Sequence, residues 1–394
     1  MKYLLITTLF LYLSIIAYSE KGVILVPVAD LIGEPLSAHP INLYDHLPLC
    51  SQKLNTKNSC PRLHQSLYNE IVIILKEKGD ELLIAIPQLF YITDDKEKKN
   101  TYWTQKKNVI PLSTLEKKKI DITKIPSPLS YEHPLQKKCN IATLIKPWLD
   151  KKTKLLFSAG TRFIIDQTTK TPPTHVAVFI IDPKKLLLRT ITIDKNACII
   201  DYPKNHHEQR KEFIHILKQW AHQPHCFIPY VWGGSSFTSC SHATTIETEA
   251  IVDNMYFTLT DYQQSPKTGF DCAGLVSRAA QIVGIPYFYK NTKTLAQFLK
   301  PLSHYESLQE GDLIWFPGHV MIISDIKNNL LIEARSYHHG YGKIHEISLD
   351  KVFKNIKNYV DLINALRSKK SIERIDVDGI IKEKISFFKI LSLL

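Results

Sequence analysis

Residues 269–286 read GFDCAGLVSRAAQIVGIP, the pattern of a short buried helix with a cysteine at its start. Apolar residues recur at helical spacing along it, at Leu275, Val276, Ala279, Ile282 and Val283. Gly284 is expected to end the helix, and Pro286 prevents its continuation. Asp271 stands where an N-cap belongs, so Cys272 falls in the first turn. Unpaired backbone N–H groups and the positive end of the helix dipole favour a thiolate there, so the stretch predicts a nucleophilic cysteine.

The composition indicates a folded chain of more than one domain. With 394 residues, the chain is long enough for two or three domains. It is 44% hydrophobic and contains 18 tyrosines and 16 phenylalanines, so it can bury substantial cores. A disordered tail is therefore excluded as a description of the whole chain.

The N-terminus, MKYLLITTLFLYLSIIAYSEKG, has the features of a secretory signal peptide. Lys2 precedes an apolar run that ends near small residues, and cleavage is expected after Ser19. The run is shorter than the roughly 20 residues of a membrane span, which disfavours an uncleaved anchor. No cysteine stands directly after the cleavage point, where a lipid anchor would be attached. No later segment is expected to span a bilayer. We therefore expect an exported protein, periplasmic or extracellular, at the cell envelope.

Seven cysteines are an odd number for an exported chain. If Cys272 stays a thiol, up to three bridges are open to the others, Cys50, Cys60, Cys139, Cys198, Cys226 and Cys240. The first pair to expect is Cys50 with Cys60, which bracket the polar loop SQKLNTKNS. A zinc site is the alternative for the group Cys226, Cys240, His222, His225 and His242. That spacing matches no standard zinc pattern, so we expect no metal.

The net charge of +12 comes largely from lysine clusters, at 94–99, 117–119 and in the stretch from Arg367. Such runs are usually solvated faces, although they also favour an anionic polymer as partner. No RNP-like aromatic pair or zinc-finger spacing accompanies them, so nucleic acid is not an expected partner. For an exported protein, an anionic wall or envelope is the natural partner.

Strand-like and helix-like patterns divide the chain into three parts. Short β-branched runs with a Lys-Gly-Asp turn predict a small barrel near the N-terminus. In the second part, THVAVFIID and LLLRTITID predict a β-hairpin, and from about 207 an amphipathic helix opens the third part. The expected organisation is a signal peptide at 1–19, a barrel at 22–115, a linker at 116–139, a second barrel at 140–205, an α+β domain at 207–366 with an insertion at 235–268, and a tail at 367–394.

His319 is the histidine with the best setting for a catalytic base. The stretch 312–336, DLIWFPGHVMIISDIKNNLLIEARS, predicts a strand, a Pro-Gly break and a β-hairpin. A hairpin centred near Ile326 pairs residues whose numbers sum to 652, such as His319 and Glu333. Their Cβ atoms would then lie about 5 Å apart on one face. Taken alone, His319 is better explained as a strand histidine and Glu333 as a surface charge, but together with Cys272 they predict a nucleophile, a base and an orienting group.

Five motifs together resemble the NlpC-type papain-like cell-wall peptidases. These are PYVWGG (229–234), GFDCAGLV (269–276), LQEGDLIWF (308–316), GHVMIIS (318–324) and LIEA (331–334). VPVADLIGEP, near the N-terminus, and FSAGTRF, in the second part, are similar to the SH3-like domains that precede the catalytic domain in such enzymes. The resemblance implies an α+β fold: two small SH3-like barrels followed by a papain-like domain, in which a helix with an N-terminal cysteine packs on an antiparallel sheet.

The resemblance also implies roles for single residues. Cys272 matches the nucleophile, His319 the general base, and Glu333 the polar residue that orients the histidine. Tyr230 matches the tyrosine beside the thiol that helps to hold the oxyanion, and Asp271 matches an aspartate in the cleft where a substrate amine could bind. Two further residues of these motifs, Trp232 and Ala273, are expected to contact substrate. The implied reaction is hydrolysis of peptidoglycan stem peptides between γ-linked D-glutamate and a diamino acid, without a cofactor.

Three features depart from the family pattern. Glu333 stands where histidine is usual, although a carboxylate can orient an imidazole, and His338 or His339 are poorer candidates for that role. Ala273 replaces the usual serine. The insertion 235–268 separates two motifs that are normally close, as a lid over the cleft or as a tolerated surface excursion.

Two other functions stay open on the sequence. One is a non-catalytic wall-binding protein whose papain-like domain is degenerate. The other is an amidase or transpeptidase on the same scaffold. The sequence leaves the oligomeric state open.

Overall fold

The computed structural model describes most of the chain. The described residues are 19–35, 62–93, 95–128, 140–200, 203, 205–240, 268–285, 291–302, 308–336 and 339–392. Residues 1–18 of the expected signal peptide and the Cys50–Cys60 pair lie outside them. Within the described ranges, no helix combines the length and apolar character needed to cross a membrane.

The N-terminal part is one seven-stranded antiparallel sheet. Its order is β3 (Arg62–Leu67), β2 (Val28–Ile32), β8 (Thr101–Gln105), β5 (Glu81–Ala85), β4 (Ile71–Lys78), β1 (Glu20–Ile24) and β9 (Val109–Pro111). The predicted Lys-Gly-Asp turn joins β4 to β5, with Gly79 at φ +60°. The smaller elements here are β6 (Tyr91–Ile92), β7 (Lys98–Lys99), η4 (Lys106–Asn108), α2 (Leu112–Lys117) and η5 (Ile122–Lys124).

This sheet is not the closed barrel that the sequence predicted. The terminal strands β3 and β9 each pair on one side only, so the sheet stays open. The edge of β3 is instead occupied by the third part of the chain. The Gln65 N–H donates to Ser235 Oγ at 3.1 Å, and the Ser235 N–H donates to Gln65 Oε1 at 3.2 Å. Docking between domains thus satisfies the strand edge that barrel closure would have covered.

The second part also contains strands without a closed barrel. It has three small sheets: β13 (Arg162–Ile164), β10 (Ile141–Leu144) and β16 (Cys198–Ile199); β11 (Trp148–Asp150) with β12 (Leu155–Phe157); and β14 (His175–Asp182) with β15 (Leu187–Asp194). The predicted hairpin is confirmed, because β14 and β15 pair over their full length. A short turn, η6 (Lys195–Ala197), precedes β16. The apolar side chains of this part share one core with Leu115, Ile120 and Ile125 of the stretch before it.

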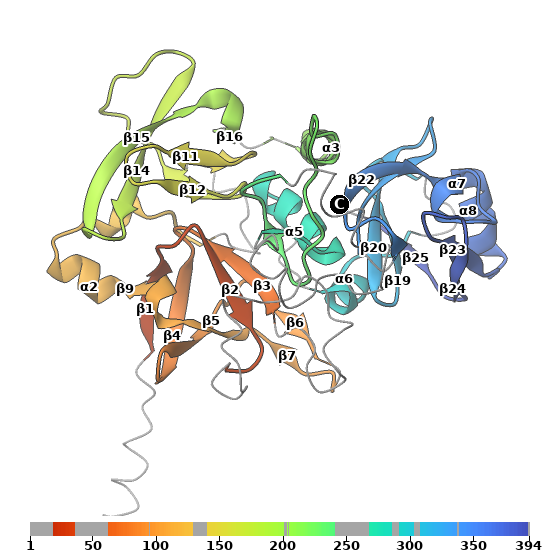
Figure 1. Ribbon diagram of the computed structural model, residues 1–394, viewed down its shortest axis with the longest axis horizontal. Helices are drawn as coiled ribbons and strands as arrows, with labels where there is room; N and C mark the ends of the chain where they lie inside the picture. Colours follow the sequence, from red (N-terminus) through yellow and green to blue (C-terminus); the bar gives the residue numbers. More distant parts are fainter. Residues whose placement is uncertain are drawn as a thin grey trace, which may run out of the picture.

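The third part is a five-stranded antiparallel sheet covered on both faces. The strand order is β22 (Lys343–Ser348), β21 (Leu330–Arg335), β20 (His319–Asp325), β19 (Leu313–Phe316) and β25 (Lys389–Leu391). One face packs against α3 (His206–Ala221), the amphipathic helix that the sequence predicted, and α5 (Cys272–Ile282). The other face packs against α7 (Leu349–Val352), α8 (Tyr359–Arg367), β23 (Ile372–Ile375) and β24 (Ile381–Ile385). Figure 1 shows α5 between this sheet and the N-terminal strands.

The C-terminal residues belong to this sheet. Strand β25 pairs with β19, with Ile314 opposite Ile390. The segment expected as a tail therefore supplies an edge strand of this sheet.

Three small elements remain in the third part. They are α6 (Thr292–Phe298), β17 (Ser235–Ser236) and β18 (Gly269–Phe270).

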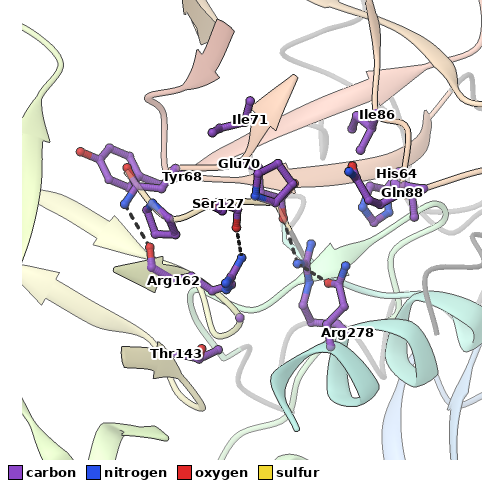
Figure 2. A pocket seen from close by; sticks show the side chains of 16 residues that line it. His64, Tyr68, Glu70, Ile71, Ile86, Gln88, Ser127, Thr143, Arg162 and Arg278 are labelled. Carbon is purple, nitrogen blue, oxygen red and sulfur yellow. Dashed lines mark hydrogen bonds and ion pairs between the residues drawn. The ribbon is translucent and has the colours of Figure 1, made fainter. Parts of the chain in front are cut away.

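A buried arginine joins the first and third parts of the chain. Figure 2 shows a cavity at their junction, where Arg278 of α5 meets Glu70 of the N-terminal part. The Arg278 side chain is 2% exposed and lies 3.0 Å from a Glu70 carboxylate oxygen. It also donates to the backbone oxygens of Ser235 and Gln65, at 2.8 and 3.0 Å. These bonds fix the orientation of α5 relative to the N-terminal sheet.

Replacing Arg278 by methionine is expected to destabilise the protein by roughly 2–4 kcal/mol. The change removes the Arg278 donor from the Ser235 oxygen, and such a loss costs about 1–3 kcal/mol. The Gln65 oxygen keeps the Ser235 hydroxyl as a donor and Glu70 is 31% exposed, so these two partners add less. Guanidinium unfolding monitored by circular dichroism measures the effect, with the exposed Arg367→Met as the matched control. Equal unfolding midpoints for the two variants would contradict the bridging role.

Candidate active site

Helix α5 begins and ends where the sequence predicted. Asp271 is its N-cap, and the Asp271 carboxylate accepts from the Gly274 N–H at 2.5 Å and from the Gly233 N–H at 3.0 Å. At the other end, Gly284 has φ +75°, and the Ile285 N–H donates to the Ala280 oxygen at 2.9 Å, closing a Schellman turn. Cys272 is thus the first residue of the helix, at the positive end of its dipole.

A glycine allows the motif around residues 229–234 to approach this helix. A Cβ atom at Gly274 would lie 2.0 Å from the Gly234 oxygen, which no side chain tolerates. The Asp271 N–H donates to that same oxygen at 3.1 Å. The close approach places Tyr230 and Trp232 beside the first turn of α5.

A cleft opens at this end of the helix, and five of the predicted site residues line it. They are Tyr230, Trp232, Asp271, Cys272 and Ala273. Cys272 and Tyr230 are nearly buried, at 7% and 5% exposure, whereas Trp232 is 37% exposed. Gly318, the residue before His319, also lines the cleft. The cleft is also lined by Arg62, Leu63 and Tyr91 of the N-terminal part, which the sequence did not indicate.

His319 and Glu333 are in contact, although the predicted register is wrong. Ile322 pairs with Ile332, and Ile323 pairs with Leu331, so paired residue numbers sum to 654 rather than 652. The loop occupies 326–329, later than expected, and a bulge follows Ile323. A two-residue shift preserves the side-chain face, so His319 reaches Glu333 diagonally. The distance between His319 Nε2 and Glu333 Oε2 is 2.7 Å.

Three further basic side chains surround Glu333, which is fully buried. Arg374 Nη2 lies 2.8 Å from Oε2, whereas Arg335 Nη1 and His345 Nε2 lie 3.4 and 3.3 Å from Oε1. Sequence patterns could have indicated two of them. Arg335 follows Glu333 at the two-residue spacing of one strand face, and His345 stands opposite Glu333 on β22. Arg374 had no local signal, because it comes from the C-terminal segment.

The charges of this cluster set the ionisation of both catalytic candidates on the sheet. Burial raises the pKa of Glu333, but the nearby Arg335 and Arg374 outweigh it and hold that pKa well below its usual range. Burial and the Arg374 charge lower the pKa of His319 to about 4, against the opposing pull of Glu333. The resting site therefore contains a carboxylate and a neutral imidazole.

The contact with Glu333 also fixes the tautomer of His319. An ionised carboxylate oxygen only accepts hydrogen bonds, so the ring nitrogen 2.7 Å away carries the proton. The Arg374 guanidinium, 3.0 Å from the same nitrogen, then acts on it as a nearby charge and not as a hydrogen-bond donor. Nε2–H then donates to Glu333, and Nδ1 is left unprotonated. A ring in this state can take a proton at Nδ1, as a general base requires.

The other candidates for the orienting role are less well placed. His339 is turned toward Ser336, 3.4 Å from the hydroxyl, and burial lowers its pKa to about 2. His338 lies outside the described residues. Glu333, in contrast, lies in direct hydrogen-bond contact with the His319 ring.

The described cysteines are free thiols, which corrects the expectation of up to three bridges. They are Cys198, Cys226, Cys240 and Cys272. The thiols of Cys226 and Cys240 are in hydrogen-bond contact, and burial raises the pKa of Cys240 to about 12. Within the described ranges, no three His, Cys, Asp or Glu side chains form a group that could hold a metal, and His242 lies outside those ranges.

The insertion leaves and re-enters the fold at one place. Ser235 pairs with Phe270 between β17 and β18, and the hydroxyls of Thr238 and Thr268 lie 2.7 Å apart. Its two stems therefore lie side by side next to the Cys272 helix. The rest of the insertion predicted at 235–268, residues 241–267, falls outside the described residues.

Comparison with solved structures shows a related fold. A NlpC/P60 family protein from Bacillus cereus ATCC 10987 matches with a TM-score of 0.54 and 17% identity, over 86% of this chain and 96% of that chain. NlpC2 and NlpC1 from Trichomonas vaginalis match with TM-scores of 0.30 and 0.31 at 10% identity, over 85% and 84% of this chain and 94% and 89% of those chains. No family model and no curated protein matches the sequence. The likeness to the Bacillus cereus protein thus shows an NlpC/P60-type fold.

Proposed function

We propose that this chain is an exported cysteine endopeptidase that hydrolyses peptidoglycan stem peptides at the γ-D-glutamyl–diamino acid bond. The observation that carries the proposal is the placement of Cys272 at a helix N-terminus in a cleft that Gly318 also lines. Gly318 directly precedes His319 in the sequence, and the His319 ring is bonded to Glu333. The NlpC/P60-type fold supports a cell-wall substrate, and the bond is inferred from the motif resemblance.

The proposed mechanism is acyl transfer through a thioester. His319 Nδ1 takes the thiol proton, and Cys272 Sγ attacks the peptide carbonyl to form a tetrahedral oxyanion. The Cys272 N–H and the Tyr230 hydroxyl stabilise this oxyanion. The C–N bond breaks as His319 protonates the leaving amine, and water then cleaves the thioester to regenerate the thiol.

The cleft walls suggest how a stem peptide is selected. Trp232 presents an exposed ring to the cleft, and Asp271 adds a carboxylate that could bind a substrate amine. Arg62 and Tyr91 narrow the cleft from the N-terminal side. A narrow cleft with a carboxylate on its wall suits a short peptide with a free amine better than a cross-linked chain.

Digestion of purified sacculi, with the products analysed by mass spectrometry, tests the proposal. We expect muropeptides cut on the γ-carboxyl side of D-glutamate. Cleavage of the sugar–peptide amide or new cross-links would instead indicate an amidase or transpeptidase. Binding to sacculi without any product would support the non-catalytic alternative.

The acidic limit of activity is expected near pH 4. The base must be neutral, and the buried His319 has a pKa of about 4, so kcat/KM should fall as pH drops through this value. In the unfolded chain the pKa of His319 is about 6.5, so the unfolded state binds a proton that the folded state does not bind until about pH 4. The free energy of unfolding should therefore decrease as pH falls from 6.5 to about 4. A pH profile on a muropeptide measures the limit, with circular dichroism to follow folding, and a limb near 6.5 would contradict the cluster electrostatics.

A further inference from the structure

Arg374 reaches the predicted catalytic histidine from the opposite face of the sheet to α5. Its Nη2 lies 3.0 Å from His319 Nε2 and 2.8 Å from Glu333 Oε2. The Arg374 side chain is 4% exposed, and its guanidinium lies over the Phe316 ring, 5.3 Å from the centroid. The arginine is therefore enclosed together with the two residues that it contacts.

The C-terminal segment holds Arg374 in this place through several independent contacts. Strand β23 pairs with β24, and the register shifts between Arg374 and Ile375, a bulge of the kind that redirects a side chain. Arg374 also forms a bridge with Phe353, beside α7. Arg335 of the central sheet donates to the Ile375 oxygen, which ties β23 to the strand that carries Glu333.

The geometry shows what this arginine does to its neighbours. Glu333 Oε2 accepts from His319 and from Arg374, so two donors converge on one carboxylate oxygen. The arginine fixes that oxygen where Nε2–H can reach it. The permanent positive charge, 3.0 Å from the ring nitrogen, also opposes a second positive charge on the imidazole.

We propose that Arg374 is a positioning residue of the catalytic site: it fixes the Glu333 carboxylate and keeps the His319 ring uncharged in the resting protein. The proposal rests on the function proposed above, in which His319 is the base. It makes the C-terminal segment a part of the active site, although that segment is remote in sequence from the motifs.

Other charged and titratable groups also face this site, and they are retained in the test. Besides Arg374 on β23, they are Glu333 and Arg335 on β21, His345 on β22, and His339 in the turn before β22. Glu333 favours a charged His319, whereas both arginines oppose it. Removing one arginine leaves the carboxylate with a single guanidinium partner and should release the imidazole toward protonation.

The test is an NMR titration of His319 in full-length protein labelled at its histidines, with the signal assigned from a His319→Gln variant. In Arg374→Met, we expect the pKa of His319 to rise by about one to three pH units. Arg374→Lys, which keeps the charge, should restore most of the wild-type value. The control Lys384→Met removes an exposed lysine from the same hairpin and should not shift the titration.

Two variants keep the result decisive. If Arg374→Met does not fold, Arg374→Gln removes the charge and keeps an amide donor for Glu333. The same rise in the pKa of His319 is expected in that variant. A folded neutral variant with the wild-type His319 titration would overturn the proposal. In active protein, the acidic limb of kcat/KM should move upward with the NMR value, which a purely structural role would not produce. A shifted titration in a protein that never cuts muropeptides would instead refute the proposed function, and only the effect of Arg374 on the His319 charge would then stand.

Discussion

Cys272→Ala is expected to abolish muropeptide hydrolysis while leaving the fold intact. The substitution removes the sulfur that forms the proposed thioester, and loss of a nucleophile typically costs about a million-fold in kcat. Alanine fits the first turn of α5, and the Asp271 cap on Gly274 does not involve the removed atom. Product formation from sacculi, together with circular dichroism, measures both parts of the expectation.

The matched control is Cys198→Ala. Cys198 is also a nearly buried free thiol, but it lies in the second part of the chain, and burial raises its pKa to about 11. We expect this variant to keep wild-type activity. A Cys272→Ala protein that still cuts, or equal losses in both variants, would remove Cys272 from the role of nucleophile.

Glu333→Ala is expected to cost about 3–5 kcal/mol of stability, as well as activity. The fully buried carboxylate is the partner of Arg335 and Arg374, and removing one member of a buried ion cluster leaves the other charges uncompensated. The sequence indicated Glu333 only as the residue that orients His319, because the two arginines were not part of the expected site. Thermal or guanidinium unfolding measures the loss, and Glu383→Ala, at an exposed site on β24, is the matched control.

The contribution of Glu333 to stability should also depend on pH. Its folded-state pKa lies well below the ordinary value of 4.5, so the stabilisation is present above 4.5 and is lost as pH falls toward the folded-state value. The difference in stability between wild type and Glu333→Gln should shrink on acidification. A difference that is constant from pH 7 to pH 3 would show that Glu333 is not an ionised partner of the arginines.

The parts of the site that local chemistry determines could be predicted from the sequence. Asp271, Gly284 and the apolar spacing between them all lie in one short stretch of sequence, so the bounds of α5 followed directly. The placement of His319 and Glu333 on one face of the sheet could also be predicted, because a register shift of two residues leaves each side chain on the same face. The shift itself was not predictable, because it depends on a four-residue loop with Asn329 in the left-handed region, at φ +56°, and on a bulge.

Features that depend on contacts between distant segments could not be predicted. The strands near the N-terminus were recognisable, but β3 ends as an edge docked on Ser235, 170 residues away, instead of closing a barrel. Arg374 lies 41 residues beyond Glu333, in a stretch with no motif. A charged residue in a basic tail resembles a solvated one until the fold shows what it contacts.

The most direct test of the central claim is alkylation of the native protein with iodoacetamide, with the modified residue mapped by mass spectrometry and hydrolysis measured on the same sample. We predict that one equivalent at Cys272 removes activity in proportion to its incorporation, that a muropeptide slows the labelling, and that His319→Gln reacts more slowly. Full modification of Cys272 in a protein that still hydrolyses stem peptides would contradict the account.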